Sequence, residues 1–464
     1  MYHVLRTQPP WCPEESATWE RAFCSAIAEY MEKIVSVGKP THGVYISCDG
    51  VVCAAKRRQQ RLRRFKGPWF SAAAAYVEGK GAPGPTWDQN ALTPGSAFMA
   101  ALGLSLQKAG AALAARTGLA VVVSTTAEPG EGEHKLLAHM RILRPASCMI
   151  YGLDADLILL SMLLHQETGA AVSLLREAQE FEKEADRSEW RTLNVPGLAA
   201  ALGLSTPQIP SFVAAMSLLG NDFLPRSLTR TVRDDGIPAL ISSLSASLIA
   251  ADGSLRLDGF RALIQGWAAT EEADMLATVK KALRDRDRHY PTDVDRWNAT
   301  PALRCGIAAL LDHSGKDHSY RLRDNWRDVY RSWSHSNVSD YCTGLAWIWD
   351  YYTGKPVDQG WFFEPHLPPL WSDIAAYLST ATALSPPPLV YPEPLPEWLH
   401  LLAVLPAASV ERLLPEKARL MNEVPWYWPT RWSLFDIGRG QMWECEPVLP
   451  IPSDATLRKL MGPV

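Results

Sequence analysis

The sequence has no strong excess of charge of either sign. Its 46 Lys and Arg residues against 50 Asp and Glu residues give a formal net charge of −4. This balance argues against a protein that binds nucleic acid through bulk charge, so any such binding must use a local basic patch. The 47% hydrophobic and 21% charged residues are typical of a globular protein.

The sequence also lacks paired cysteines and membrane segments. Its eight cysteines are scattered, with no CxxC pair and no Cys/His spacing suited to zinc. The first residues lack the apolar core of a signal peptide. The longest apolar stretch, Cys148–Leu164, is interrupted by Asp154 and Asp156 and is too short to span a bilayer. We therefore expect an intracellular protein without a membrane, in the cytoplasm rather than the nucleus.

Three short apolar runs predict buried parallel strands, at Val44–Cys48, Leu119–Ser124 and Cys148–Leu153. One helix is predicted before the first strand, at Ala17–Ile34, and another between the first two strands, at Pro94–Arg116, which Thr93-Pro94 would open. This alternation indicates an α/β fold with right-handed crossovers. Acidic residues follow each strand, at the sheet edge where ligands of such folds bind.

The sequence changes character after residue ~230. Polar helices are predicted at Leu255–Ala282 and Ala302–His313, before an aromatic block from Trp326 to Trp371 and a proline-rich extended connector from Ser385 to Pro396. We expect a first domain at 1–230 and a mainly helical, Trp- and Pro-rich second region at 231–464 that packs on it.

Six carboxylates stand in four short blocks, and each block but the last follows a predicted strand. They are Asp49, Glu131, Glu133, Asp154, Asp156 and Asp222. Glu131 and Glu133 are two residues apart, so both would point to one side of an extended chain. Any one block is most often a turn or a helix cap. Together they favour metal binding, because converging carboxylates repel unless cations such as two Mg²⁺ or Mn²⁺ ions neutralise them.

A basic helix is predicted directly after Asp49. Lys56, Gln60, Arg63 and Arg64 recur at the spacing of one helical face. Arg forks bind phosphate oxygens bidentately, and Lys and Gln complete such a site. A solvated basic helix or a nuclear-import signal is the alternative, but this helix follows the strand that bears Asp49, so we favour a phosphate site. Metal-binding acids beside a phosphate site are typical of a nuclease.

Five blocks resemble the Xrn family of 5′→3′ exoribonucleases, within the flap-endonuclease-like (PIN-like) superfamily. They lie, in order, at residues 48–65, 90–99, 129–135, 151–158 and 218–225. Residues 344–363, 402–406 and 449–452 resemble later landmarks of the family more loosely. The resemblance implies a PIN-like parallel sheet flanked by helices.

The resemblance also implies site residues and a reaction. The six acids would bind metal and form the catalytic site, and Lys56, Gln60, Arg63 and Arg64 would hold the 5′-monophosphate of single-stranded RNA. Trp361 would stack on the terminal base. We expect a monomeric enzyme of RNA decay that releases nucleoside 5′-monophosphates by two-metal hydrolysis. Alternatives are a flap-type structure-specific endonuclease and a catalytically impaired protein that binds RNA without cutting it.

The sequence departs from the family pattern at several places. Family members carry an N-terminal strand that ends in a further Asp, and this chain begins just after the aligned position. Arg6 falls where the family has a base-stacking His, Arg226 where it usually has His, and Glu364-Pro365 replaces a more aromatic pair. A misassigned or trimmed start, an impaired enzyme and a degenerate nuclease would each explain the missing acid. We favour the first, because the other six acids are retained.

Overall fold

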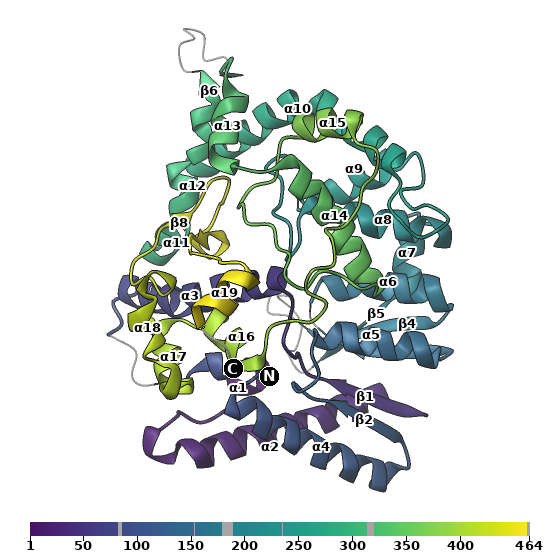
Figure 1. Ribbon diagram of the computed structural model, residues 1–464, viewed down its shortest axis with the longest axis vertical. Coiled ribbons are helices and arrows are strands. Elements are labelled where there is room, and N and C mark those ends of the chain that lie inside the picture. Colours follow the sequence, from purple (N-terminus) through teal and green to yellow (C-terminus); the bar gives the residue numbers. More distant parts are fainter. Residues whose placement is uncertain (82–85, 153, 179–188, 234, 313–319, 462–464) are drawn as a thin grey trace.

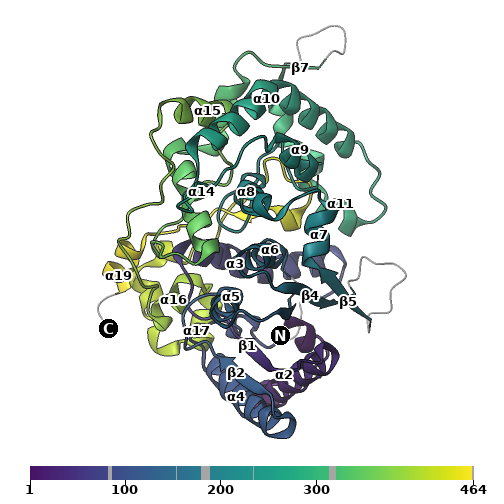
Figure 2. The same ribbon diagram turned by 90° about the vertical axis from the view of Figure 1, so that its right-hand side faces the viewer.

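The protein is described by a computed structural model that covers residues 1–81, 86–152, 154–178, 189–233, 235–312 and 320–461. Two small sheets with their helices form one end of the molecule, and helices α10, α13 and α15 form the opposite end (Figure 1). Helix α3 (Ala54–Val77) crosses between them in both views (Figure 2). This helix is therefore placed to contact both ends of the fold.

The first sheet contains two parallel strands. β1 (Gly43–Ser47) pairs with β2 (Ala120–Ser124), in a register that runs from Gly43 opposite Ala120 to Ser47 opposite Ser124. Helices α2 (Ser16–Gly38) and α4 (Ala97–Thr117) pack against each other, and α4 packs on β2. Both strands were predicted within one residue of their observed ends.

Helix α4 begins three residues later than predicted. Thr93-Pro94-Gly95 form a turn in which Gly95 has a φ of 90°, and the helix starts after Ser96, whose Oγ accepts a hydrogen bond from the Met99 N–H at 3.1 Å. A serine in this position satisfies one of the free N–H groups of the first helical turn. The N-cap hydroxyl, rather than Pro94, thus sets the start of the helix.

The second sheet contains three strands. β3 (Ser147–Tyr151) is parallel to β4 (Ala171–Glu177), and β4 is antiparallel to β5 (Trp190–Asn194). Helix α5 (Gly132–Leu143) packs on α6 (Asp156–Thr168), and α6 packs on β4. β4 and β5 were not predicted from the sequence, and β3 ends two residues before the predicted Leu153, which lies outside the described residues.

The α/β class is confirmed, but the strands do not form one continuous sheet. Among the described residues no strand joins β1 to β3, so β1 to β5 form two separate sheets where a single parallel sheet was predicted, and the second half adds two small two-stranded sheets, β6-β7 and β8-β9. Side chains rather than backbone connect the two parts: the hydroxyls of Tyr30, on α2, and Tyr151, on β3, both donate to Glu177. A parallel ladder requires neighbouring backbones about 4.8 Å apart, and no described strand bridges these two edges.

The second half is mainly helical. Helix α10 (Leu257–Arg286) confirms one predicted helix. The helix predicted at Ala302–His313 is wrong, because Cys305 has a φ of 46° and ends α12 (Thr300–Arg304), after which a 3₁₀ turn (Gly306–Leu310) leads to β6 (Leu311–Asp312). Position 313 lies outside the described residues. A left-handed residue in a helix interior interrupts its hydrogen-bond ladder.

The aromatic block folds into α13 (Trp326–Ser334), α14 (Val338–Thr353) and the start of α15 (Trp371–Thr380). Residues 385–396 contain neither helix nor strand, as the proline-rich sequence predicted. The remaining elements are α1 (Tyr2–Leu5), α7 (Val195–Ala201), α8 (Ile209–Met216), α9 (Gly236–Ser243), α11 (Asp293–Asn298), β7 (Arg321–Leu322), α16 (Glu397–Val404), α17 (Ala407–Leu413), α18 (Leu420–Glu423), β8 (Leu434–Phe435), β9 (Glu446–Pro447) and α19 (Asp454–Met461).

The largest core cluster draws on both halves of the chain. It contains Leu160 and Leu218 from the first half together with Trp267, Trp347 and Ile374 from the second, all nearly inaccessible. One shared core of this kind holds the helical half firmly on the sheets. Residues from both sides of the predicted division near residue 230 share this core, and the division itself stays a prediction.

By length and composition alone, helix α4 could cross a membrane, as could the bent pair formed by residues 195–201 and 206–219. Helices in the interior of soluble proteins meet the same criteria. In this fold α4 packs between α2 and β2.

The closing segment is attached to α3 by a buried arginine. Arg61, 2% exposed, donates hydrogen bonds to the carbonyl oxygens of Ala403 and Pro450 at 3.0 and 3.2 Å and to that of Tyr427. Its guanidinium lies 3.9 Å from the centre of the Tyr427 ring. These contacts bring residues almost 400 positions away in the sequence to the side of α3.

Candidate active site

The acidic blocks meet between the sheets and α3. Asp49 follows β1, and its Oδ1 accepts a hydrogen bond from the N–H of Gly132 at 2.8 Å. Gly50 allows this turn to pass close to the next block, since a Cβ there would lie only 1.9 Å from the carbonyl oxygen of Glu128. The first two blocks are thereby fixed against each other through the backbone.

Four of the acids lie at the N-termini of helices. Glu131 is the N-cap residue of α5 and has an extended backbone, whereas Glu133 lies in the first helical turn and not in the extended chain that the sequence predicted. Asp156 is the first residue of α6, and Asp154 precedes it by two. The N–H groups and the dipole of a helix N-terminus favour negative charge, which lowers the cost of gathering these carboxylates.

Lys56 binds two of the six acids. Its Nζ lies 2.5 Å from Glu131 Oε2 and 2.7 Å from Asp222 Oδ2. The hydroxyl of Tyr351 donates to the other oxygen of Glu131 at 2.7 Å. The side chains of Lys56 and Glu131 are only 14% and 4% exposed. We name Lys56, Glu131 and Asp222 the lysine-paired group, in which the chain itself supplies the countercharge.

Glu133, Asp154 and Asp156 form a second group, which we name the acidic triad. Each offers a carboxylate oxygen, and these oxygens all lie within 4.8 Å of one another. Burial, followed by the charges of Asp156 and Glu131, raises the pKa of Glu133 to about 9. Burial also raises the pKa of Asp156. Three carboxylates crowded in this way fit a divalent cation, which prefers oxygen ligands and would offset their repulsion.

The neighbouring groups are shielded from water. Burial raises the pKa of Glu131 to about 7, although Lys56 and the Tyr351 hydroxyl both act to lower it. Burial lowers the pKa of His134 to about 3, and the charges of Lys56 and Arg141 lower it further, so this imidazole is neutral. His134 also offers a ligand atom within 4.8 Å of those of Glu131 and Glu133.

Asp222 is held by a turn with its own hydrogen bonds. Asn221 Oδ1 accepts from the N–H groups of Phe223 and Leu224, both at 2.9 Å, and Gly220 has a φ of 92°. A side chain at Gly220 would be 2.6 Å from Arg226 Cα. The Gly-Asn-Asp block therefore shapes a turn and presents Asp222 to Lys56.

The predicted phosphate-binding residues have different surroundings. Lys56 faces the acids, Arg63 is exposed, and Gln60 is half-buried. Arg64 Nε donates to Thr93 Oγ1 at 3.0 Å, and Gln60 Oε1 accepts no hydrogen bond from any described residue. The predicted helix is present and carries these residues next to the acids, and their role in phosphate binding stays a prediction.

Trp361, the predicted base-stacking residue, is partly buried. Its ring lies 5.1 Å from that of Trp347, its Nε1–H donates to Asp340 at 3.1 Å, and it packs where a Cβ at Gly344 would stand. These contacts fix the ring against α14. Its role as a stacking platform stays a prediction.

Two nearby residues, Tyr351 and His134, were not assigned from the sequence. His134 lies within an acidic block, and its ring packs against that of Tyr351 at 4.1 Å between ring centres and 42° between ring planes. Tyr351 lies in the aromatic block of the second half, where nothing in the sequence distinguishes it from its neighbours. Its contact with Glu131 joins residues 220 positions apart.

The chain was compared with known proteins. Residues 6–178 match the family described as XRN 5′-3′ exonuclease N-terminus. 5′-3′ exoribonuclease 2 of Schizosaccharomyces pombe is 28% identical over 330 residues, which is 57% of this chain and 33% of that protein. 5′-3′ exoribonuclease 1 of Saccharomyces cerevisiae is 30% identical over 278 residues, covering 52% and 18% respectively. 5′-3′ exoribonuclease 2 of the same yeast is 28% identical over 322 residues, covering 54% and 31%.

These matches span about a third or less of the relatives' own length. The region matched by the family model contains the acidic triad, Asp49, Glu131 and the first helical turns of α3. Over residues 6–178 the chain is therefore similar to the Xrn family, and the relatives extend this similarity over about half of the chain.

Proposed function

We propose that this protein is a metal-dependent 5′→3′ exoribonuclease that degrades 5′-monophosphorylated RNA to nucleoside 5′-monophosphates. The observation that carries the proposal is the acidic triad, lying directly beside the lysine-paired group and the basic helix α3. The printed names of the relatives, which are 5′-3′ exoribonucleases, support the same activity for this chain.

Glu133, Asp154 and Asp156 would hold a divalent cation, with Asp49, Glu131 and Asp222 beside them for a second. When bound, such ions (Mg²⁺ or Mn²⁺) supply an activated water as the nucleophile and offset charge on the leaving oxygen. No covalent enzyme intermediate is expected, because water attacks the phosphodiester directly.

The residues of the chain itself bind and orient the substrate in this proposal. Arg63, Gln60 and Arg64 would bind the terminal phosphate, and Arg64 is anchored by its hydrogen bond to Thr93. Lys56 holds Glu131 and Asp222 at fixed positions. A site for one terminal phosphate gives the reaction its direction, since it admits only a single-stranded end with a monophosphate. We further propose that the protein acts as a monomer in the cytoplasm.

One observation favours a second candidate, an RNA-binding protein without turnover. Lys56 already occupies one oxygen each of Glu131 and Asp222, so the chain itself offsets one of the negative charges of these two acids. This candidate predicts affinity for RNA with no metal-dependent release of nucleotides.

The test compares 5′-monophosphorylated with 5′-hydroxyl RNA in the presence of Mg²⁺, with Asp154→Ala as the inactive reference. We expect stepwise release of mononucleotides from the first substrate, slow release from the second, and none with the variant. Equal rates on both substrates would contradict the phosphate site. Cleavage only at branched junctions would indicate a flap-type endonuclease, and binding without cleavage the second candidate.

A further inference from the structure

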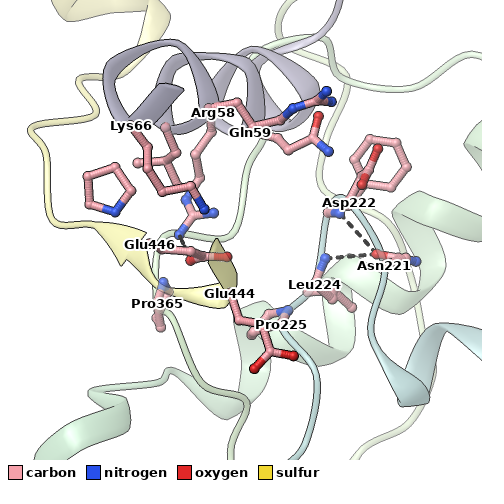
Figure 3. Close-up of a pocket in the computed structure, with 14 residues that line it drawn as sticks. Arg58, Gln59, Lys66, Asn221, Asp222, Leu224, Pro225, Pro365, Glu444 and Glu446 are labelled. Atoms are coloured by element: carbon pink, nitrogen blue, oxygen red, sulfur yellow. Dashed lines mark hydrogen bonds and ion pairs between the residues drawn. The ribbon is translucent and has the colours of Figure 1, made fainter. Parts of the chain in front are cut away.

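A pocket of about 200 Å³ lies on the flank of α3, and we name it the α3 pocket (Figure 3). Its walls come from α3, the turn at residues 221–225, Pro365 and residues 444–447. It shares Asp222 with the lysine-paired group and Arg63 with the predicted phosphate-binding face. A ligand in this pocket would therefore adjoin the site where the chemistry is proposed.

Much of the lining is apolar and rigid. These residues are Leu62, Phe223, Leu224, Pro225, Pro365 and Pro447. Lys66 fixes one wall to α3, since its Nζ lies 2.7 and 2.8 Å from the carbonyl oxygens of Trp443 and Cys445. Preformed walls of this kind suit a flat ring, which loses little freedom when it is bound between them.

Glu446 supplies the main polar feature. Its Oε2 lies 2.6 Å from His366 Nδ1 and 4.0 Å from Arg58 Nη2, while no described residue donates to its Oε1. Figure 3 shows its carboxylate extending from β9 into the pocket. Burial acts to raise the pKa of Glu446, but the hydrogen bond with His366 and the charge of Arg58 outweigh it and bring the pKa to about 2. The carboxylate is thus a permanent acceptor at neutral pH.

The other polar lining adds a further acceptor. Gln59 Oε1 is buried and accepts no hydrogen bond from any described residue. Glu444 is already engaged: its Oε2 accepts from the Gly440 N–H at 2.8 Å, and its Oε1 lies 3.3 Å from Arg233 Nη1. Three carboxylates (Asp222, Glu444 and Glu446) and three cations (Arg58, Arg63 and Lys66) line this pocket, so it carries no excess of positive charge that would select a phosphate group. Its unused acceptors suit a ligand with N–H donors.

We propose that the α3 pocket binds a nucleobase with an exocyclic amino group, from a nucleotide next to the cleaved linkage of the RNA. This inference rests on the proposed function. Adenine, cytosine and guanine present an amino group to Glu446, whereas the single polar N–H of uracil lies between two carbonyl oxygens that the carboxylate repels. Arg63, at the shared edge, is placed to contact the adjoining phosphate. The enzyme should therefore release nucleotides more slowly when a uridine occupies this pocket.

The test uses the full chain and 5′-monophosphorylated oligoadenylate in which a single uridine is moved through positions 1 to 5. We expect one position at which uridine slows nucleotide release and weakens metal-free binding by about tenfold or more, the value of one lost hydrogen bond to a charged group. Glu446→Gln should reduce that difference to less than about twofold, because the amide can donate to a uracil carbonyl.

Glu272→Gln serves as the matched control, because Glu272 is 66% exposed on α10 and pairs only with Arg327 at 3.4 Å among the described residues. Glu272→Gln should keep the full difference between uridine and adenosine. Gln59→Leu, which changes no charge, should weaken the preference if Glu446→Gln fails to fold. Equal rates and affinities at all five positions, or an unchanged preference in both variants, would overturn the inference. Absence of turnover on every substrate would instead contradict the proposed function, and the binding measurement would still test the pocket.

Discussion

The two halves of the acidic cluster are neutralised in different ways. In the lysine-paired group, Glu131 and Asp222 share the ammonium of Lys56 at 2.5 and 2.7 Å. In the acidic triad, Glu133, Asp154 and Asp156 face one another within 4.8 Å. The first group has one ammonium for its two carboxylates, and the second has no ion pair among the described residues. The difference indicates that the need for a divalent cation is greatest in the triad.

The largest expected effect comes from the triad itself. Asp156→Asn should reduce nucleotide release by about a hundredfold or more, because a ligand of the cation is lost. The same change should raise the midpoint of thermal unfolding in EDTA, because it removes a repelling charge. Rates and melting curves measure both effects. Asp328→Asn, at a 75% exposed site in α13, is the control and should alter neither. A variant that is both fully active and less stable would contradict the assignment.

Removing the ammonium of Lys56 from the lysine-paired group should lower the stability of the protein. Lys56→Met leaves Glu131 buried beside Asp222 without a countercharge and should lower the free energy of unfolding by about 3 kcal/mol. Urea denaturation measures this loss, with Lys80→Met, at a 72% exposed lysine, as the control. Mn²⁺ should restore part of the stability, since it replaces the lost charge. An unchanged stability would show that Lys56 does not hold this group together.

The comparison also predicts a pH dependence of the metal-free protein. The folded-state pKa of Glu133, about 9, lies above its ordinary value of 4.5, so the folded state binds this proton more tightly. This contribution to stability is complete below pH ~4.5 and is lost as the pH rises towards 9. Denaturation in EDTA at pH 5, 7 and 9 should show a fall that is smaller in Glu133→Gln. An equal fall of stability with pH in wild type and in Glu133→Gln would contradict the raised pKa of Glu133.

The smallest effect concerns the hydroxyl of Tyr351. Tyr351→Phe removes its hydrogen bond to Glu131 and should cost about 1 kcal/mol of stability. Tyr76→Phe, at an 84% exposed tyrosine, provides the baseline for losing a hydroxyl. A cost equal to that of the control would mean that Lys56 alone holds Glu131 in place.

The sequence predicted the acids better than their surroundings. Each acidic residue could be recognised because it follows an apolar strand or interrupts an apolar run, and both are local features. The position of Glu131 and Glu133 at the start of α5 was missed, since Pro129, Gly130 and Gly132 are equally typical of an extended turn. The pairing of Lys56 with Asp222 joins residues 166 positions apart, which helical spacing cannot reveal.

The α3 pocket and the division into sheets were also missed, because both depend on contacts between residues far apart in the sequence. Glu446 meets Arg58 across almost 390 positions, so its place beside α3 depends on the docking of the whole closing segment. β4 was missed because its apolar run continues almost directly from α6, with only Gly169 between them as a signal. The division into two sheets depends on which edges meet, and this is a property of the assembled fold rather than of any single strand.

The most direct test of the central claim is a Mn²⁺ titration followed by electron paramagnetic resonance, in wild type, Asp156→Asn and Tyr351→Phe. The account predicts that wild type and Tyr351→Phe remove free Mn²⁺ from solution with similar affinity, because the triad is intact in both. Asp156→Asn should bind at least about tenfold more weakly. Equal binding by Asp156→Asn and wild type would contradict the claim that the acidic triad holds the catalytic cation.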